Sequence, residues 1–312
     1  MSSQPLSVER AAGGARPRST VTFIRRHRLI GYVFIAPWLV AFLLFEAIPI
    51  LSGFYHSFTD WTATGRATNF IGLRNYSEAL TRDPLFWISV RRTLYFIGVS
   101  VPLGIVIAFG LALMLNARIR GTTAYRTIYY LPAVVPTVAA VIVWVFIFET
   151  RRGILNFLLE LVGLPPVRWL SDPRAAMPAL IIMSLWGLGA AMVIFLAGLQ
   201  GIPQELYEAA EVDGASSRRK LMAITVPLMT PTIFFNLVMN LVAAFQAFNN
   251  AFIMTNGGPN NATLLYMLHL YNNAFRYFRM GYASALAVML FVVVFGLTVL
   301  VYRTSNRWVY YD

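Results

Sequence analysis

The residues with the greatest capacity for polar chemistry lie in one short segment, 203–228, of an otherwise apolar chain. Four of the thirteen acidic residues fall within it, and three basic residues follow them directly. Pro203 suits the first turn of a helix, and Gly214 suits the left-handed residue just past a helix end. Two serines after this turn can cap a second short helix, which we expect to stop before Pro227. The segment is therefore a candidate docking surface.

A second set of polar residues lies in an apolar run near the C-terminus. At 100° per residue, Asn236, Asn240, Gln246 and Asn250 share one helix face about 120° wide, and we expect the opposite, phenylalanine-rich face to contact lipid. Amides donate and accept hydrogen bonds without a counter-ion, so the face suits a pathway for a neutral polar solute. Packing between helices would use the same residues, and both interpretations stay open. The other pathway candidates are Asn249, which lies off the face, and Trp186 and Ser284 in other runs.

The composition indicates what must position these residues. The chain has 312 residues, of which 58% are hydrophobic and 12% are charged, whereas soluble proteins carry about 25% charged residues. Apolar runs of about 20 residues predict an all-α polytopic membrane protein. The six expected spans are 29–51, 93–115, 128–148, 177–199, 232–254 and 283–302. Pro132 and Pro136 should bend the third span, and Gly187, Gly189 and Gly198 should permit close helix contacts in the fourth.

The N-terminus predicts the orientation of the chain. Residues 1–28 read as a disordered, basic cytoplasmic tail, and the apolar run that follows is too long for a signal peptide. An uncleaved first span with its N-terminus inside, followed by five more spans, places both termini in the cytoplasm. The net charge of +12 does not indicate nucleic-acid binding, because the arginines lie in loops and beside spans, as membrane orientation requires.

The sequence lacks the residues that several possible mechanisms would need. The chain has no GxxxxGK[ST] phosphate loop, no cysteine, and three histidines without metal-ligand spacing. We therefore expect no cofactor or metal to be bound by this chain. The span interiors are almost free of ionisable residues, which disfavours an ion-coupled transporter or a membrane enzyme with buried carboxylates.

Within segment 203–228, Glu208-Ala209-Ala210, followed by Gly214, Ile224 and Pro227, resembles the EAA loop of permease subunits of bacterial ABC importers. Four further segments are similar to the carbohydrate-uptake branch of that family, and within it to the larger subunit of the maltose permease. These segments are 70–76, 131–144, 153–156 and 255–259. The resemblance covers nearly all of the chain after the N-terminal tail. The extra N-terminal spans and the large second outer loop of the maltose subunit are missing here.

The resemblance implies the six-helix type I ABC importer permease fold in a bacterial inner membrane, and a non-enzymatic subunit of a sugar or oligosaccharide importer. It implies three partners: a second homologous permease, a cytoplasmic ATPase dimer that uses ATP and Mg, and an extracytoplasmic sugar-binding protein. Glycerol phosphate is an alternative solute, although a phosphate would favour arginines in the cavity and the expected spans contain none. A membrane enzyme would need a polar catalytic cluster that the sequence does not show, and a scaffold would leave the EAA loop unexplained. The residues expected to couple to the ATPase are Glu205, Glu208, Ala209, Ala210, Asp213, Gly214 and Pro227.

Overall fold

The computed structural model describes residues 34–64, 68–117 and 121–310. The predicted tail 1–28 and the first residues of the first predicted span lie outside this part of the chain. Within the described residues the chain is helical, with a single isolated bridge between Thr59 and Phe70. The elements are η1 (Leu43–Ala47), α2 (Ile48–His56), α3 (Arg74–Thr81), α4 (Pro84–Asn116), α5 (Thr122–Val134), α6 (Thr137–Ile147), α7 (Ile154–Leu161), α8 (Ala176–Trp186), α9 (Gly189–Gln200), α10 (Gln204–Val212), α11 (Ser217–Lys220), η2 (Leu221–Thr225), α12 (Val226–Leu228), α13 (Thr230–Phe245), α14 (Asn249–Met254), α15 (Tyr266–Tyr271), η3 (Asn272–Arg276) and α16 (Met280–Ser305).

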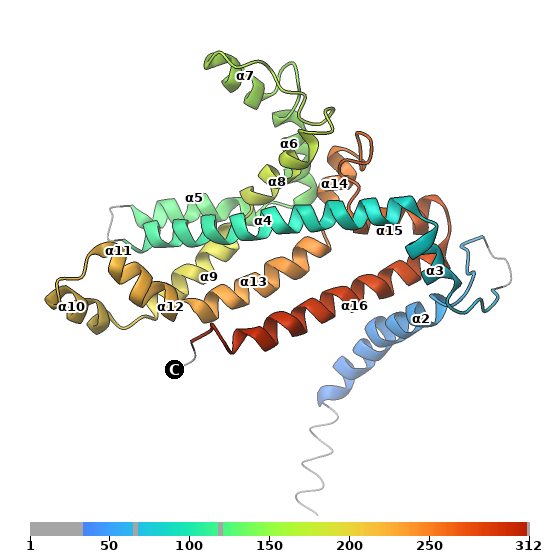
Figure 1. Ribbon diagram of the computed structural model, residues 1–312, viewed down its shortest axis with the longest axis horizontal. Helices are drawn as coiled ribbons and strands as arrows, with labels where there is room; N and C mark the ends of the chain where they lie inside the picture. Colours follow the sequence, from blue (N-terminus) through green and yellow to red (C-terminus); the bar gives the residue numbers. More distant parts are fainter. Residues whose placement is uncertain (1–33, 65–67, 118–120, 311–312) are drawn as a thin grey trace, which may run out of the picture. The chain divides into compact units, whose positions relative to one another are not determined.

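The described helices support a polytopic membrane protein. Four are long and apolar enough to cross a membrane, and two bent pairs, α5 with α6 and α8 with α9, bring the total to as many as six. The chain divides after Gly53 into two units. The first apolar helix, Phe34–His56, continues past the predicted end at residue 51. In the second unit, α4, α9, α13 and α16 run side by side (Figure 1).

The second predicted span begins earlier than expected, because a local cap starts the helix before the apolar run. α4 begins at Pro84, whereas the apolar run predicts a start at residue 93. The Asp83 carboxylate accepts hydrogen bonds from the backbone N–H groups of Leu85 (2.9 Å) and Phe86 (3.3 Å). Such a cap followed by proline at the first position is a strong helix start.

Three of the predicted spans are broken rather than continuous. α5 and α6 meet at 100°, and α8 and α9 at 48°. Val135 is extended at the first break, as expected for a residue before proline, and Pro136 forms the N-cap of α6. The predicted bend is therefore confirmed, and it is a complete interruption of the helix. The fifth predicted span lies mostly within one candidate span, Thr230–Met254, in which Gln246–Phe248 interrupt the helix between α13 and α14 without a bend as large as those of the two bent pairs.

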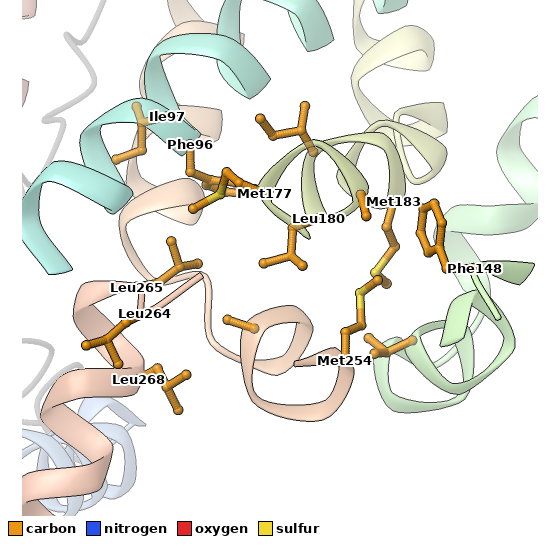
Figure 2. Packing of buried hydrophobic residues seen from close by; sticks show 14 of the residues in the cluster. Phe96, Ile97, Phe148, Met177, Leu180, Met183, Met254, Leu264, Leu265 and Leu268 are labelled. Carbon is orange, nitrogen blue, oxygen red and sulfur yellow. The ribbon is translucent and has the colours of Figure 1, made fainter. Parts of the chain in front are cut away.

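Gly189 allows two helices to touch through their backbones. A Cβ atom at Gly189 would lie 2.4 Å from the carbonyl oxygen of Tyr129 in α5, whereas a Cβ at Gly187 would meet no atom within 4 Å. Of these two glycines, Gly189 makes the predicted close contact and Gly187 does not. The second unit also contains a main apolar cluster, in which Met183 of α8 and Met254 of α14 point toward one another beside Leu180 (Figure 2).

A buried polar network joins the ends of α4, α15 and α16. Oδ2 of Asp83, the carboxylate oxygen that does not cap α4, accepts hydrogen bonds from the Tyr282 hydroxyl (2.6 Å) and from Nε2 of His269 (2.9 Å). Burial removes water from Asp83, but the hydrogen bonds that it accepts outweigh this desolvation and hold the pKa of Asp83 below its ordinary value. For His269 the effect of burial is the larger one: it lowers the pKa of the imidazole more than the attraction of Asp83 raises it. The network is thus built around a neutral imidazole.

This network predicts acid-sensitive stability. Unfolded histidine has a pKa of about 6.5. Below that pH the unfolded state therefore binds a proton that folded His269, whose pKa is lower, does not yet bind. The contribution of His269 is therefore complete above about pH 6.5 and is lost as the pH falls toward the folded pKa. Thermal unfolding of the detergent-purified protein between about pH 7.5 and pH 5 should show a falling midpoint, and His269→Gln should flatten this dependence. An equally steep dependence in the variant would contradict the assignment.

The two glycines at the bend between α8 and α9 offer a matched pair. Gly189→Ala should lower the free energy of unfolding by ~1–3 kcal/mol, because the new methyl group would force the backbones of α5 and α9 apart. Gly187→Ala should change it by less than ~1 kcal/mol, because its site is open. Thermal unfolding in detergent measures both, and equal effects would contradict the backbone contact.

Candidate functional site

The polar segment after α9 forms two helices joined by a glycine turn, as predicted. Pro203 is extended and precedes α10 as its N-cap, one position before the predicted first turn. Gly214 has a φ of 73°, in the left-handed region. The N–H of Ala215 donates to the carbonyl of Ala210 (2.9 Å), and the N–H of Gly214 donates to that of Glu211 (3.0 Å). This pair of bonds is the Schellman ending that favours glycine.

Two side-chain contacts fix α10 against the second helix. The Tyr207 hydroxyl lies 2.8 Å from the Thr225 hydroxyl, and Lys220 forms an ion pair with Glu211 at 2.6 Å. The bond from Lys220 holds the pKa of the Glu211 carboxyl below its ordinary value. The free surface that remains is partly apolar and partly acidic; its exposed residues include Glu205, Leu206, Glu208, Ala209, Val212 and Asp213.

The second helix does not stop before Pro227, contrary to the prediction. α11 passes through the wide turn η2 into α12, which contains Pro227, and only Met229 separates α12 from α13. Proline removes an N–H and crowds the carbonyl four residues earlier, and a π-type turn directly before it gives the backbone room. Met229 keeps a right-handed helical conformation, and its N–H donates to the carbonyl of Thr225 (2.9 Å). The polar segment is thus joined to α13 by an almost unbroken helical path.

α13 leads from this segment to a cavity of about 420 Å³ within the second unit. The cavity lies where the broken helices α5–α6, α8–α9 and α13–α14 change direction, and α4 closes one side. Its lining includes no charged side chain. The polar lining residues are Ser100, Thr137, Ser184, Asn240, Gln246, Asn249 and Asn250.

The amides of this cavity are available to bind a solute. Asn240 donates one hydrogen bond to the carbonyl of Asn236 (2.8 Å), which leaves its oxygen free. Among the described residues, the side chains of Gln246, Asn249 and Asn250 have no hydrogen-bond partner. Several donors and acceptors that converge on one uncharged cavity can bind a hydroxyl-rich molecule without a counter-ion.

The single continuous amide face does not exist, because the helix breaks at residues 246–248. Asn240, Gln246 and Asn250 still meet at the cavity, and so does Asn249, which a continuous helix would place off the face. Asn236 instead is 1% exposed and donates to the carbonyl of Thr232 (3.0 Å) in its own helix.

The structure places the remaining pathway candidates outside the cavity lining. Trp186 stands edge-on to Trp144, with 6.2 Å between the ring centroids. Ser284 is half-buried in α16. The predicted lipid face is also wrong in part, because Phe248 and Phe252 stack on one another at 5.0 Å and both contact Tyr271. The break turns these two rings into the protein interior.

Ser100 and Thr137 line the cavity but were not predicted from the sequence. Ser100 lies two residues before Pro102 inside α4, and Thr137 directly follows Pro136 at the start of α6. Each is a hydroxyl residue beside a proline within an apolar run. That pattern marks places where a helix is weakened near a polar side chain, and it could have identified both residues.

No group of three or more potential metal-ligating side chains occurs among the described residues. The site therefore consists of an uncharged amide-lined cavity and a polar helical segment, connected through α13. This arrangement can bind a neutral solute at one place and receive a mechanical input at another.

Comparisons with known proteins show the family to which the chain belongs. The family model described as "Binding-protein-dependent transport system inner membrane component" matches residues 100–309. The probable ABC transporter permease protein YesP of Bacillus subtilis is 42% identical over 293 residues, which cover 93% of this chain and 94% of YesP. The trehalose/maltose transport system permease protein MalF of Thermococcus litoralis is 34% identical, over 91% of this chain and 95% of that protein.

A solved structure shares the fold. In the crystal structure of a bacterial ABC transporter involved in the import of the acidic polysaccharide alginate, one chain superposes with a TM-score of 0.80 at 25% identity. The match covers 92% of this chain and 98% of the other.

Proposed function

Because the chain belongs to the family of binding-protein-dependent transport system inner membrane components, we propose that it forms part of the translocation pathway of an ATP-driven importer for a neutral sugar or oligosaccharide. The observation that supports this is the uncharged, amide-lined cavity at the breaks of three helices. Sugar hydroxyls both donate and accept hydrogen bonds, and so do the amides of Gln246, Asn249 and Asn250.

The importer needs further subunits. This chain would pair with a second homologous permease, and an extracytoplasmic sugar-binding protein would deliver the solute. A cytoplasmic ATPase dimer would hydrolyse ATP with Mg, because the sequence carries no phosphate-binding loop. The permease itself has no catalytic role, and it lies in a bacterial inner membrane with both termini in the cytoplasm.

The coupling surface is the exposed side of α10. Glu205 and Glu208 can pair with basic groups of the ATPase, while Ala209 keeps the helix thin enough to enter a cleft. Movement of α10 would pass through the Tyr207–Thr225 and Lys220–Glu211 contacts to the second helix. From there the helical path into α13 ends at Gln246, in the wall of the cavity.

The charge of the cavity favours a sugar over glycerol phosphate. A phosphate group would bring about two negative charges into the pathway, and binding sites for it commonly use arginine. The lining residues include neither arginine nor lysine. A neutral solute therefore fits this cavity better.

Replacement of the cavity amides tests the substrate assignment. Gln246→Leu and Asn250→Leu should each remove one or more hydrogen bonds to the solute, worth about 1 kcal/mol or roughly fivefold in apparent affinity per bond. The measurement is uptake, in proteoliposomes with all partner subunits, of the sugar that binds to the cognate binding protein. Gln200→Leu, at an exposed position outside the lining, is the control and should leave uptake unchanged. Normal uptake by both cavity variants would assign these amides to packing.

The conformation of the glycine turn tests the coupling assignment. Gly214→Val should abolish sugar-stimulated ATP hydrolysis while the protein still inserts in the membrane, because a β-branched residue is strained at positive φ by roughly 1–2 kcal/mol or more. Gly214→Asn should retain most activity, because asparagine adopts this conformation readily. ATP hydrolysis by the reconstituted complex measures both variants. Equal activity of the two would show that the turn conformation is unimportant.

A further inference from the structure

The short helix α7 exposes an apolar surface where the chain leaves α6. Its spacing places Ile154, Phe157, Leu158 and Leu161 on one face, at intervals of three and four residues, and Val162 and Leu164 continue this face beyond the helix end. These six residues, the α7 face, are 51–70% exposed in the isolated chain. The other side of the helix is already covered by the protein, since Leu155 packs against the main apolar cluster and Asn156 is buried. An apolar helix face of this width is normally buried too.

The α7 face is held in place by a polar clasp. The Asn156 side chain donates to the carbonyls of Thr150 (2.9 Å) and Val167 (2.8 Å), and it accepts from the N–H of Val167 (3.0 Å) and from the indole of Trp169 (2.9 Å). All the hydrogen-bonding capacity of this buried amide is therefore used. The Glu149 carboxylate accepts further hydrogen bonds from the backbone N–H groups of Arg151 and Arg152. The surface is preorganised, which lowers the entropy cost of docking.

Neither water nor the hydrocarbon core is a suitable environment for this face. Arg151 and Arg152 precede α7, and Glu160 lies in its last turn; all three are exposed, and charged side chains are costly within the hydrocarbon core. Six side chains that are more than half exposed present an apolar area on the order of 600 Å², most of the roughly 800 Å² that each partner buries in a standard interface. Figure 1 shows α6 and α7 turned away from the bundle of α4, α9, α13 and α16.

We infer that the α7 face is a permanent contact surface for the second permease subunit, an inference that rests on the proposed importer. A binding protein that docks and leaves at each transport cycle would need a more polar surface, because large apolar faces belong to obligate interfaces. A lipid surface is less suitable, because helices that lie on membranes carry Lys and Arg on their polar face, whereas α7 contains neither and has Glu160. In addition, a fluid lipid surface does not need the fixed α7 geometry that the hydrogen bonds of Asn156 maintain, whereas a folded protein partner does.

A photo-cross-linking amino acid at position 157 tests the inference in the complete importer. The bulky aromatic probe replaces Phe157, which is 59% exposed, and the same probe at Phe70, which is 69% exposed and outside the α7 face, is the control. Illumination of membranes that contain all subunits should give a covalent adduct with the second permease from position 157 and much less of it from position 70. An adduct from position 157 with the binding protein or with lipid only, or no adduct from an intact complex, would overturn the inference.

A charge within the face gives a second measurement. Leu161→Arg should reduce the amount of second permease that copurifies in detergent at least several-fold, whereas Glu160→Arg, one residue away at the edge of the face, should not. The thermal unfolding midpoint of each purified variant shows whether the chain itself still folds. Normal copurification of folded Leu161→Arg would overturn the role of the α7 face and leave the proposed importer intact. Failure of the wild-type chain to copurify with any second permease would instead contradict the proposed importer itself.

Discussion

The requirement that buried backbone groups find hydrogen-bond partners controls this structure. A continuous helix satisfies that requirement within an apolar span, so each interruption of a span exposes N–H and carbonyl groups that need polar surroundings. The described spans are interrupted at Val135–Pro136, Gly187–Leu188 and Gln246–Phe248. Residues at or beside all three interruptions line one cavity. Breaks and cavity therefore depend on each other: the cavity supplies a polar environment for the breaks, and the breaks direct polar side chains into the cavity.

The same breaks divide the second unit into two groups of helices. α5, α9 and α13 pack against one another or against α4, whereas α14 packs against α6 and α8. Of the first group, α13 is joined through α12 and the wide turn η2 to α11, the helix that contacts α10. In the proposed importer, a displacement of α10 would therefore pass through the Tyr207–Thr225 and Lys220–Glu211 contacts and then along the helical path into α13, as far as the cavity wall. Such an arrangement would concentrate a conformational change at the proposed solute site.

Features fixed by local chemistry could be predicted from the sequence, and features fixed by distant contacts could not. The six apolar runs, the bend at Pro136 and the left-handed Gly214 each follow from a few neighbouring residues. The break after Phe245 has no proline or glycine to signal it; the aromatic contacts of Phe248 and Phe252 with Tyr271 accompany it. The His269–Asp83 bond joins residues 186 positions apart, beyond the reach of any local pattern. Pro227 misled the prediction because the helix accommodates it with a wide turn.

The residues proposed to bind the solute and the residues proposed to couple to the ATPase are separate sets, and this separation has a consequence for specificity. The cavity presents Asn240, Gln246, Asn249 and Asn250, whereas the contacts of α10 use the Tyr207–Thr225 pair and the Lys220–Glu211 pair. Substitutions in the lining can therefore change the cargo without disturbing the path from α10. A relative involved in import of an acidic polysaccharide has the same fold at only 25% identity. If the shared fold supplies the coupling path, the chemistry of a few lining side chains, uncharged in this protein, would determine which solutes it admits.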